Sequence, residues 1–167
     1  MRAKCFADWI DILNERVGYV VSFLILPMTL ISVIEVVLRY VFNRPTIWAW
    51  DTNMMLLGAL TVMAGGYAFL KEGHVAMDAF VSRMSLRSRA VTALITSLLF
   101  FFGIGILAWQ SGLAAWDSFL MREEVNSIWR PPLYPLKMLW PIGVLLLLLQ
   151  GVAGFIRNFD KAKSKEA

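Results

Sequence analysis

The sequence predicts an all-α integral membrane protein, a bundle of four transmembrane helices with short amphipathic helices in the membrane interface. Four apolar stretches occupy most of the chain, at residues 17–41, 48–70, 90–109 and 136–156. Each reaches or approaches the roughly 20 residues that cross about 30 Å of hydrocarbon. The chain is also 59% hydrophobic, against about 45–50% in soluble domains. Residues 97–109 and 144–149 are apolar on all sides, which argues against a soluble bundle of amphipathic helices.

The pattern divides the chain into three parts. These are a cytoplasmic amphipathic segment at 1–16, the four-helix transmembrane domain at 17–157 and a basic cytoplasmic tail at 158–167. The first apolar run is longer than the apolar core of a signal peptide, and it lacks an A-x-A-like cleavage site. We therefore expect it to be retained as the first span.

The basic residues predict the orientation. One side of the membrane would carry eleven of the 16 Lys and Arg residues, three before the first span, four between the second and third spans and four in the tail. The positive-inside rule then places both termini in the cytoplasm. Because the charges sit at helix ends, the net charge of +4 does not indicate a nucleic-acid partner.

The sequence offers no catalytic or cofactor-binding pattern. Cys5 is the sole cysteine, so an intramolecular disulfide is impossible, and His74 is the sole histidine, so one subunit cannot supply a bis-histidine haem site. No spacing typical of metal ligands is present. We expect a protein that is not an enzyme and that holds no cofactor or metal.

The first two elements are an amphipathic helix and a bent span. Apolar residues recur at helical spacing before the first span: Phe6, Trp9, Ile10 and Leu13. The opposite face is acidic, so packing against a partner or against the bundle itself explains this helix better than binding to anionic lipid does.

In the first span, Pro27 removes a backbone hydrogen bond and predicts a bend. Glu35 and Arg39 lie at i, i+4 and predict a structural ion pair. The alternative is that Glu35 is a proton- or cation-coupling carboxylate.

The connection to the second span is short and rich in charged and aromatic residues. Residues 43–45 predict a tight turn, and Thr46 is placed to cap the second span. Trp48 and Trp50 are expected at headgroup depth, with Asp51 beside them.

Small and polar residues predict helix contacts. The second span has a smooth face made of Gly58, Thr61, Gly65 and Ala68. In the fourth span, Gln150 is a polar group in hydrocarbon and needs a hydrogen-bond partner, either in the bundle or in another subunit.

Between the second and third spans, residues 75–84 predict a short helix, and His74 and Asp78 are spaced to bond to each other. The external loop at 117–135 contains three prolines, which predict a stiff turn.

Several of these motifs together resemble the small membrane subunit of TRAP transporters, the DctQ-like family. The motifs are Arg39-Tyr-Val-Phe-Asn-Arg-Pro45 with Trp48, Gly73-His-Val-Ala-Met-Asp78, and Pro141-Ile-Gly143 with Gln150-Gly151. The resemblance covers roughly residues 17–157. Asp51 stands where many relatives carry Glu, a change that keeps the charge. Ala76 and Met77 replace a position that is often basic.

The resemblance implies a scaffold subunit of a sodium-coupled importer of an organic acid anion. Its partners would be a large membrane subunit (M-type), which holds the substrate and sodium sites, a periplasmic solute-binding protein and the lipid bilayer. Two rivals remain: a four-span proton-coupled exporter that acts as a homodimer through Glu35, and the membrane anchor of a redox enzyme, which the missing haem histidines disfavour. Candidate contacts to the partner or between helices are Trp48, Trp50, Asp51, Gly58, Gly65, His74, Asp78 and Gln150.

Overall fold

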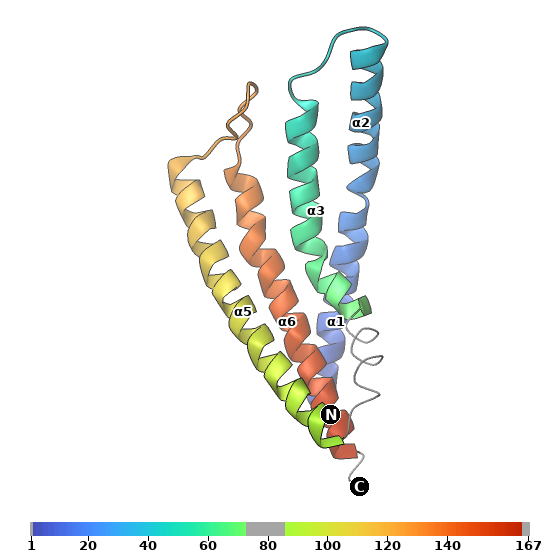
Figure 1. Cartoon of the computed structure of the whole chain (residues 1–167), viewed down its shortest axis with the longest axis vertical. Helices are drawn as coiled ribbons and strands as arrows, with labels where there is room; N and C mark the ends of the chain where they lie inside the picture. The colour runs from blue at the N-terminus through green and yellow to red at the C-terminus, as the bar shows by residue number, and fades with distance from the viewer. Residues whose placement is uncertain (1, 73–85, 165–167) are drawn as a thin grey trace.

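The computed structural model describes residues 2–72 and 86–164, with side chains placed from 6 to 71 and from 95 to 156. The elements are α1 (Arg2–Ser22), α2 (Ile25–Tyr40), α3 (Ala49–Glu72), α5 (Leu86–Met121) and α6 (Tyr134–Ser164) (Figure 1). Four stretches are long and apolar enough to cross a membrane: Phe6–Tyr40, Ala49–Lys71, Ile95–Met121 and Tyr134–Ile156. The predicted all-α fold with four spans is therefore confirmed.

α1 and α2 together make the first span, and Pro27 explains why they are two helices. Proline lacks an N–H, and its ring clashes with the carbonyl of the residue four positions earlier, here Phe23. The helix breaks at Phe23 and Leu24, where the N–H of Leu26 donates instead to the Phe23 carbonyl at 3.1 Å. Across residue 16, by contrast, α1 continues without a break. The amphipathic segment is thus the beginning of the spanning helix.

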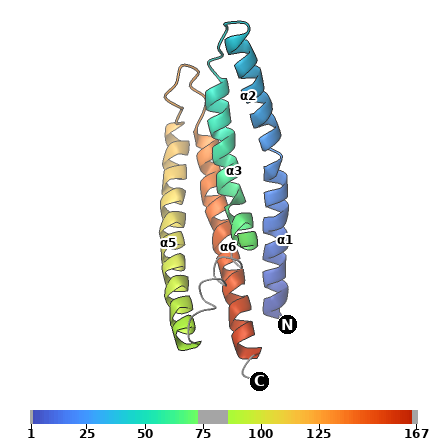
Figure 2. The same cartoon turned by 45° about the vertical axis from the view of Figure 1, so that its right-hand side comes forward.

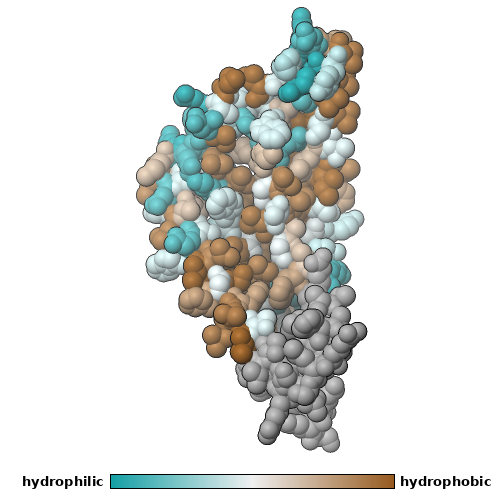
Figure 3. All heavy atoms as spheres, viewed as in Figure 1, coloured by the Kyte–Doolittle hydropathy of each residue, from teal (hydrophilic) through white to brown (hydrophobic). Residues whose placement is uncertain are grey.

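α6 lies at the centre of the bundle. It packs against α1, α3 and α5, whereas α2 packs mainly against α3 and has no buried residue (Figures 1 and 2). Both termini lie at the same end of the molecule, as an even number of spans requires. Large apolar side chains are exposed along every helix (Figure 3), because a surface that faces lipid needs no polar covering.

The third span is longer than the sequence predicts. α5 continues to Met121, twelve residues beyond the expected end at Trp109. Its outer third contains polar residues that weaken the apolar signal. Two of them, Ser111 and Ser118, are buried on the side of α5 that packs against α6. The Ser111 hydroxyl donates to the Ala108 carbonyl at 3.1 Å, so it is satisfied within the helix.

The two connections at the end of the bundle opposite the termini are compact. α5 ends at Met121, and the next residue, Arg122, has a left-handed φ of 47°. The Glu123 N–H donates to the Ser118 carbonyl at 3.0 Å, a pattern that satisfies the last carbonyls of the helix. The chain then forms a hydrogen-bonded hairpin at 122–133, in which the Leu133 N–H donates to the Glu123 carbonyl at 2.8 Å. The predicted stiff turn is therefore a short antiparallel hairpin.

Candidate functional site

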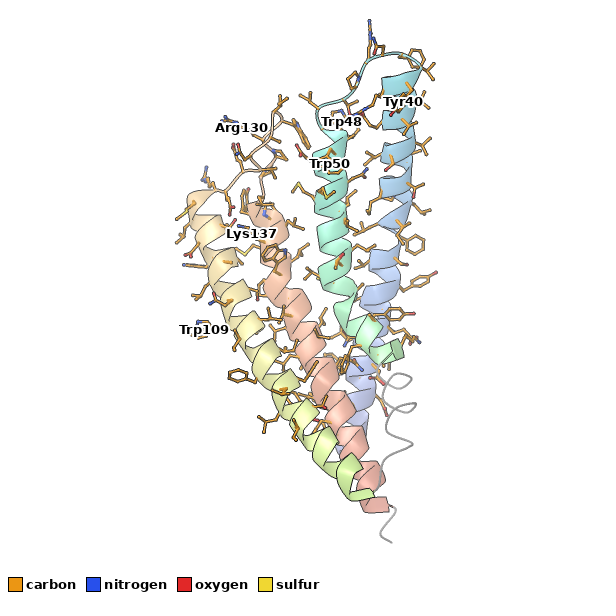
Figure 4. All side chains as sticks on the ribbon, in the orientation of Figure 1. Tyr40, Trp48, Trp50, Trp109, Arg130 and Lys137 are labelled. Carbon is orange, nitrogen blue, oxygen red and sulfur yellow. The ribbon has the colours of Figure 1, made fainter. Side chains whose placement is uncertain are left out.

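The end of the bundle opposite the termini gathers five of the ten candidate residues, which are Glu35, Arg39, Trp48, Trp50 and Asp51. Hydrophilic side chains concentrate there, over the connection between α2 and α3 and over the hairpin at 122–133 (Figure 3). Tyr40, Trp48, Trp50 and Arg130 lie at this end, with Lys137 slightly below it (Figure 4). Trp50 is 71% exposed and Trp48 is 36% exposed. This end therefore presents the chain's aromatic and charged groups together.

Glu35 joins the end of α2 to the turn that follows it. Its Oε1 accepts from Arg39 Nη2 at 2.6 Å and from Arg39 Nε at 3.0 Å. Its Oε2 accepts from the Thr46 N–H at 3.1 Å and from the Thr46 hydroxyl. The expectation that Thr46 caps the second span is wrong, because α3 begins only at Ala49 and the Thr46 side chain is committed to Glu35. Both carboxylate oxygens thus have donors, which favours a structural role over proton carriage.

Asp51 is the most unusual of these residues. It lies in the first turn of α3 and is only 8% exposed, yet its Oδ2 has no hydrogen-bond partner. The positive end of the α3 dipole favours a carboxylate at this position. That interaction still leaves a buried oxygen without a donor, and such an atom carries the full cost of its lost hydration. Asp51 is therefore poised to accept a hydrogen bond from outside this chain.

A cavity of about 340 Å³ separates Asp51 from the hairpin. Asp51, Met54 and Met55 line it from α3, and residues 123–126 line it from the hairpin. In the hairpin, Glu123 Oε2 forms an ion pair with Lys137 Nζ of α6 at 2.5 Å. The Lys137 ammonium lowers the pKa of Glu123 below its ordinary value of 4.5. With Lys137 engaged by Glu123, the cavity retains an acidic character around Asp51.

A second polar cluster lies between the helices near the other end. Asn14 of α1 is 1% exposed, and its Nδ2 donates to Gln150 Oε1 at 2.8 Å and to the Ile10 carbonyl at 3.2 Å. Gln150 Nε2 in turn donates to Asp11 Oδ1 at 2.8 Å. The partner that Gln150 requires is thus within its own chain, and the cluster joins α1 to α6.

Sequence reasoning missed Asn14. The predicted apolar stripe included Phe6 and Trp9, which are 48% and 59% exposed, whereas the buried stripe of α1 is Ala7, Ile10 and Asn14. A signal was present, since Asn14 follows Ile10 by four residues and Gln150 needed a polar partner. What sequence could not provide was the rotation of α1 about its axis.

The candidate glycines differ in what surrounds them. A Cβ on Gly58 would lie 3.4 Å from Leu136 of α6, an ordinary contact, and a Cβ on Gly65 would have no atom within 4 Å. The close approach in this part of α3 falls instead at Gly66, where a Cβ would lie 2.1 Å from Asn14 Oδ1. Within this chain, Gly65 therefore makes no helix contact of its own.

His74 and Asp78 lie outside the described residues, as does the predicted helix at 75–84. Among the residues that the structure does describe, no group of three His, Cys, Asp or Glu side chains is arranged to hold a metal ion.

Comparison with known proteins adds an independent line of evidence. The family model described as "Tripartite ATP-independent periplasmic transporters, DctQ component" matches residues 28–161. A relative from Vibrio cholerae, named "C4-dicarboxylate TRAP transporter small permease protein DctQ", is 22% identical over 77 residues. The match covers 46% of this chain, and the chain spans about a third of that relative's length, 33%.

Proposed function

Because this chain belongs to the DctQ family of tripartite ATP-independent periplasmic (TRAP) transporter components, we propose that it is the small scaffold subunit of a sodium-coupled importer. The transported solute is an organic acid anion, which a periplasmic solute-binding protein delivers to a large M-type membrane subunit. The family match over residues 28–161 carries this proposal. The name of the Vibrio cholerae relative makes four-carbon dicarboxylates the first solutes to test.

The internal contacts of the bundle support a scaffold role. A transporter core places unpaired polar groups and broken helices around a midplane site. Here the interhelical amides of Asn14 and Gln150 bond to each other, and Glu35 is occupied by Arg39 and Thr46. These contacts join neighbouring helices, and one acceptor in the cluster, Asn14 Oδ1, is buried without a donor. The Glu35 contacts also weigh against the proton-coupled exporter.

Transport should therefore require the large subunit. In proteoliposomes with an inward sodium gradient, the chain alone should accumulate no labelled four-carbon dicarboxylate. The chain with the large subunit and a loaded solute-binding protein should accumulate it. Sodium-driven uptake or proton-driven export by this chain alone would refute the scaffold role and favour the exporter.

In the orientation that we propose, the chain spans the inner membrane and both termini lie in the cytoplasm. The test is labelling with a membrane-impermeant thiol reagent in intact spheroplasts, in a Cys5→Ser background. Asn126→Cys in the external hairpin should be labelled, whereas Arg83→Cys should be labelled only after lysis. The reverse pattern would invert the proposed topology.

We also propose that the cavity beside Asp51 receives a cationic or amide donor from the large subunit. Asp51→Asn removes the charge at nearly constant volume. The new amide NH2 cannot accept the hydrogen bond that Oδ2 would take from a partner, so the change should reduce co-purification of the large subunit. Asp117→Asn is the matched control, because that carboxyl is exposed at the same end. Unchanged co-purification for Asp51→Asn would show that water alone serves this oxygen.

A further inference from the structure

The outward face of α5 carries a polar side chain at the depth of the hydrocarbon. Gln110 is exposed, and the structure of the described residues gives its amide no hydrogen bond. It lies within the span Ile95–Met121, seven residues inward from Asp117, which corresponds to about 10 Å below that charged residue. An amide without a partner is costly in lipid, because no water reaches it there.

The surroundings of Gln110 also differ from an ordinary lipid-facing surface. Phe102, Ile106, Trp109 and Leu113 follow at i, i+4, i+7 and i+11 on the same outward face. Trp109 is 71% exposed and projects away from the other helices (Figure 4). It lies about 12 Å inward from Asp117, although indoles favour the headgroup region.

This face is also hollowed. A shallow, open depression of about 450 Å³ lies against α5, and its lining residues all belong to that helix: Phe101, Phe102, Gly105, Ile106, Trp109 and Gln110. Gly105 has no atom within 4 Å of where a Cβ would stand, so nothing in the chain fills the hollow at that point. A bulky side chain from another helix could enter it.

The other side-chain amides within the four described spans, those of Asn14, Asn53 and Gln150, are hydrogen-bonded. Gln150 is 3% exposed and paired with Asn14, and Ser111 and Ser118 of α5 are buried on the side that faces α6. Gln110 is the side-chain amide in the described spans that departs from this pattern, on an exposed side of α5.

We propose that the face of α5 formed by Phe102, Gly105, Ile106, Trp109, Gln110 and Leu113 seats a transmembrane helix of the large subunit. That helix would supply a hydrogen-bonding group to the Gln110 amide and a large side chain to the hollow beside Gly105. The proposal rests on the proposed function, since a large membrane subunit supplies the occupant. The Gln110 amide has no hydrogen-bond partner, and the depression beside Gly105 is lined by α5 alone. A second helix could satisfy the amide and fill the depression, whereas lipid tails have no hydrogen-bonding group.

Photo-crosslinking in the assembled complex tests the occupant. A photoreactive benzoylphenylalanine at position 109 replaces one bulky aromatic group by another and should form an adduct with the large subunit. A complex that assembles but yields adducts only with lipid, or only with a second copy of this chain, would overturn the proposal. If the unmodified chain forms no complex, the proposed function fails, and this inference fails with it.

The two glutamines of the chain provide a matched pair of variants for the amide. Gln110→Leu should weaken association with the large subunit about 3- to 10-fold, the range expected from one interhelical hydrogen bond. The melting temperature of the isolated chain should be unchanged or higher. Gln150→Leu should instead lower that melting temperature, because its partners are internal. Association of Gln110→Leu equal to that of the unmodified chain would show that the amide meets only lipid.

Discussion

Two adjacent glycines of α3 allow the packing of this bundle to be tested one residue at a time. Gly66 faces α1 and α6, where a Cβ would lie 2.1 Å from Asn14 Oδ1 and 3.3 Å from a backbone carbon of Leu146. Gly65, one residue earlier, has open space. Alanine adds the same methyl group to the same helix at both positions, so the difference between the two variants isolates the helix contact.

The magnitude for Gly66→Ala follows from these distances. An approach of 2.1 Å is about 1.3 Å inside the 3.4 Å at which ordinary contact begins. Asn14 cannot retreat without losing its 2.8 Å bond to Gln150, and α6 stands behind it. Overpacking of a filled interior costs about 1–3 kcal/mol. One interhelical hydrogen bond adds about 0.6–2 kcal/mol. We expect Gly66→Ala to destabilise the chain by about 2–4 kcal/mol.

Gly65→Ala should have the opposite effect. With nothing for the methyl group to meet, the change only reduces the backbone entropy lost on helix formation, worth up to about 1 kcal/mol of stabilisation. The measurement is reversible unfolding of each purified variant in mixed micelles, followed by the loss of helical circular dichroism. A stability for Gly66→Ala equal to that of the unmodified chain, or an equal loss for both variants, would refute the predicted close approach of α1 and α6 at Gly66.

Three further predictions follow from the polar contacts. Lys137 lowers the pKa of Glu123, so the stabilisation from this pair should be complete above pH 4.5 and should be lost as the pH falls through the pKa of Glu123 in the folded state. Glu123→Gln should therefore reduce the loss of stability that is measured as the pH is lowered. For Glu35 and Arg39, Glu35→Gln and Arg39→Ala should each reduce folded yield, and the double variant should lose less than the sum, which a double-mutant cycle measures. Gln150→Leu should destabilise the isolated chain by about 1–3 kcal/mol in thermal unfolding, because the buried Asn14 and the partly buried Asp11 lose their bonds to it.

Local features were readable from the sequence. Span number follows from the length of apolar runs, since crossing hydrocarbon sets a minimum length whatever the packing. The position of the break in the first span follows from Pro27, because its steric effect acts on the residue four positions earlier. The Glu35–Arg39 geometry is set within one helical turn and is present in the structure at 2.6 Å. Each of these depends only on neighbours along the chain.

The tertiary structure decided which side of each helix faces another helix. In a soluble protein the apolar stripe reveals that side, but here residues that face lipid and residues that face the bundle are both apolar. The sequence therefore favoured Gly65, where the close approach is at Gly66, and it did not identify Asn14 as the partner of Gln150. The burial of Asp51 and the exposure of Gln110 depend on the same rotations. Those rotations arise from contacts between residues more than a hundred positions apart, such as Asn14 and Gln150, and no local pattern encodes them.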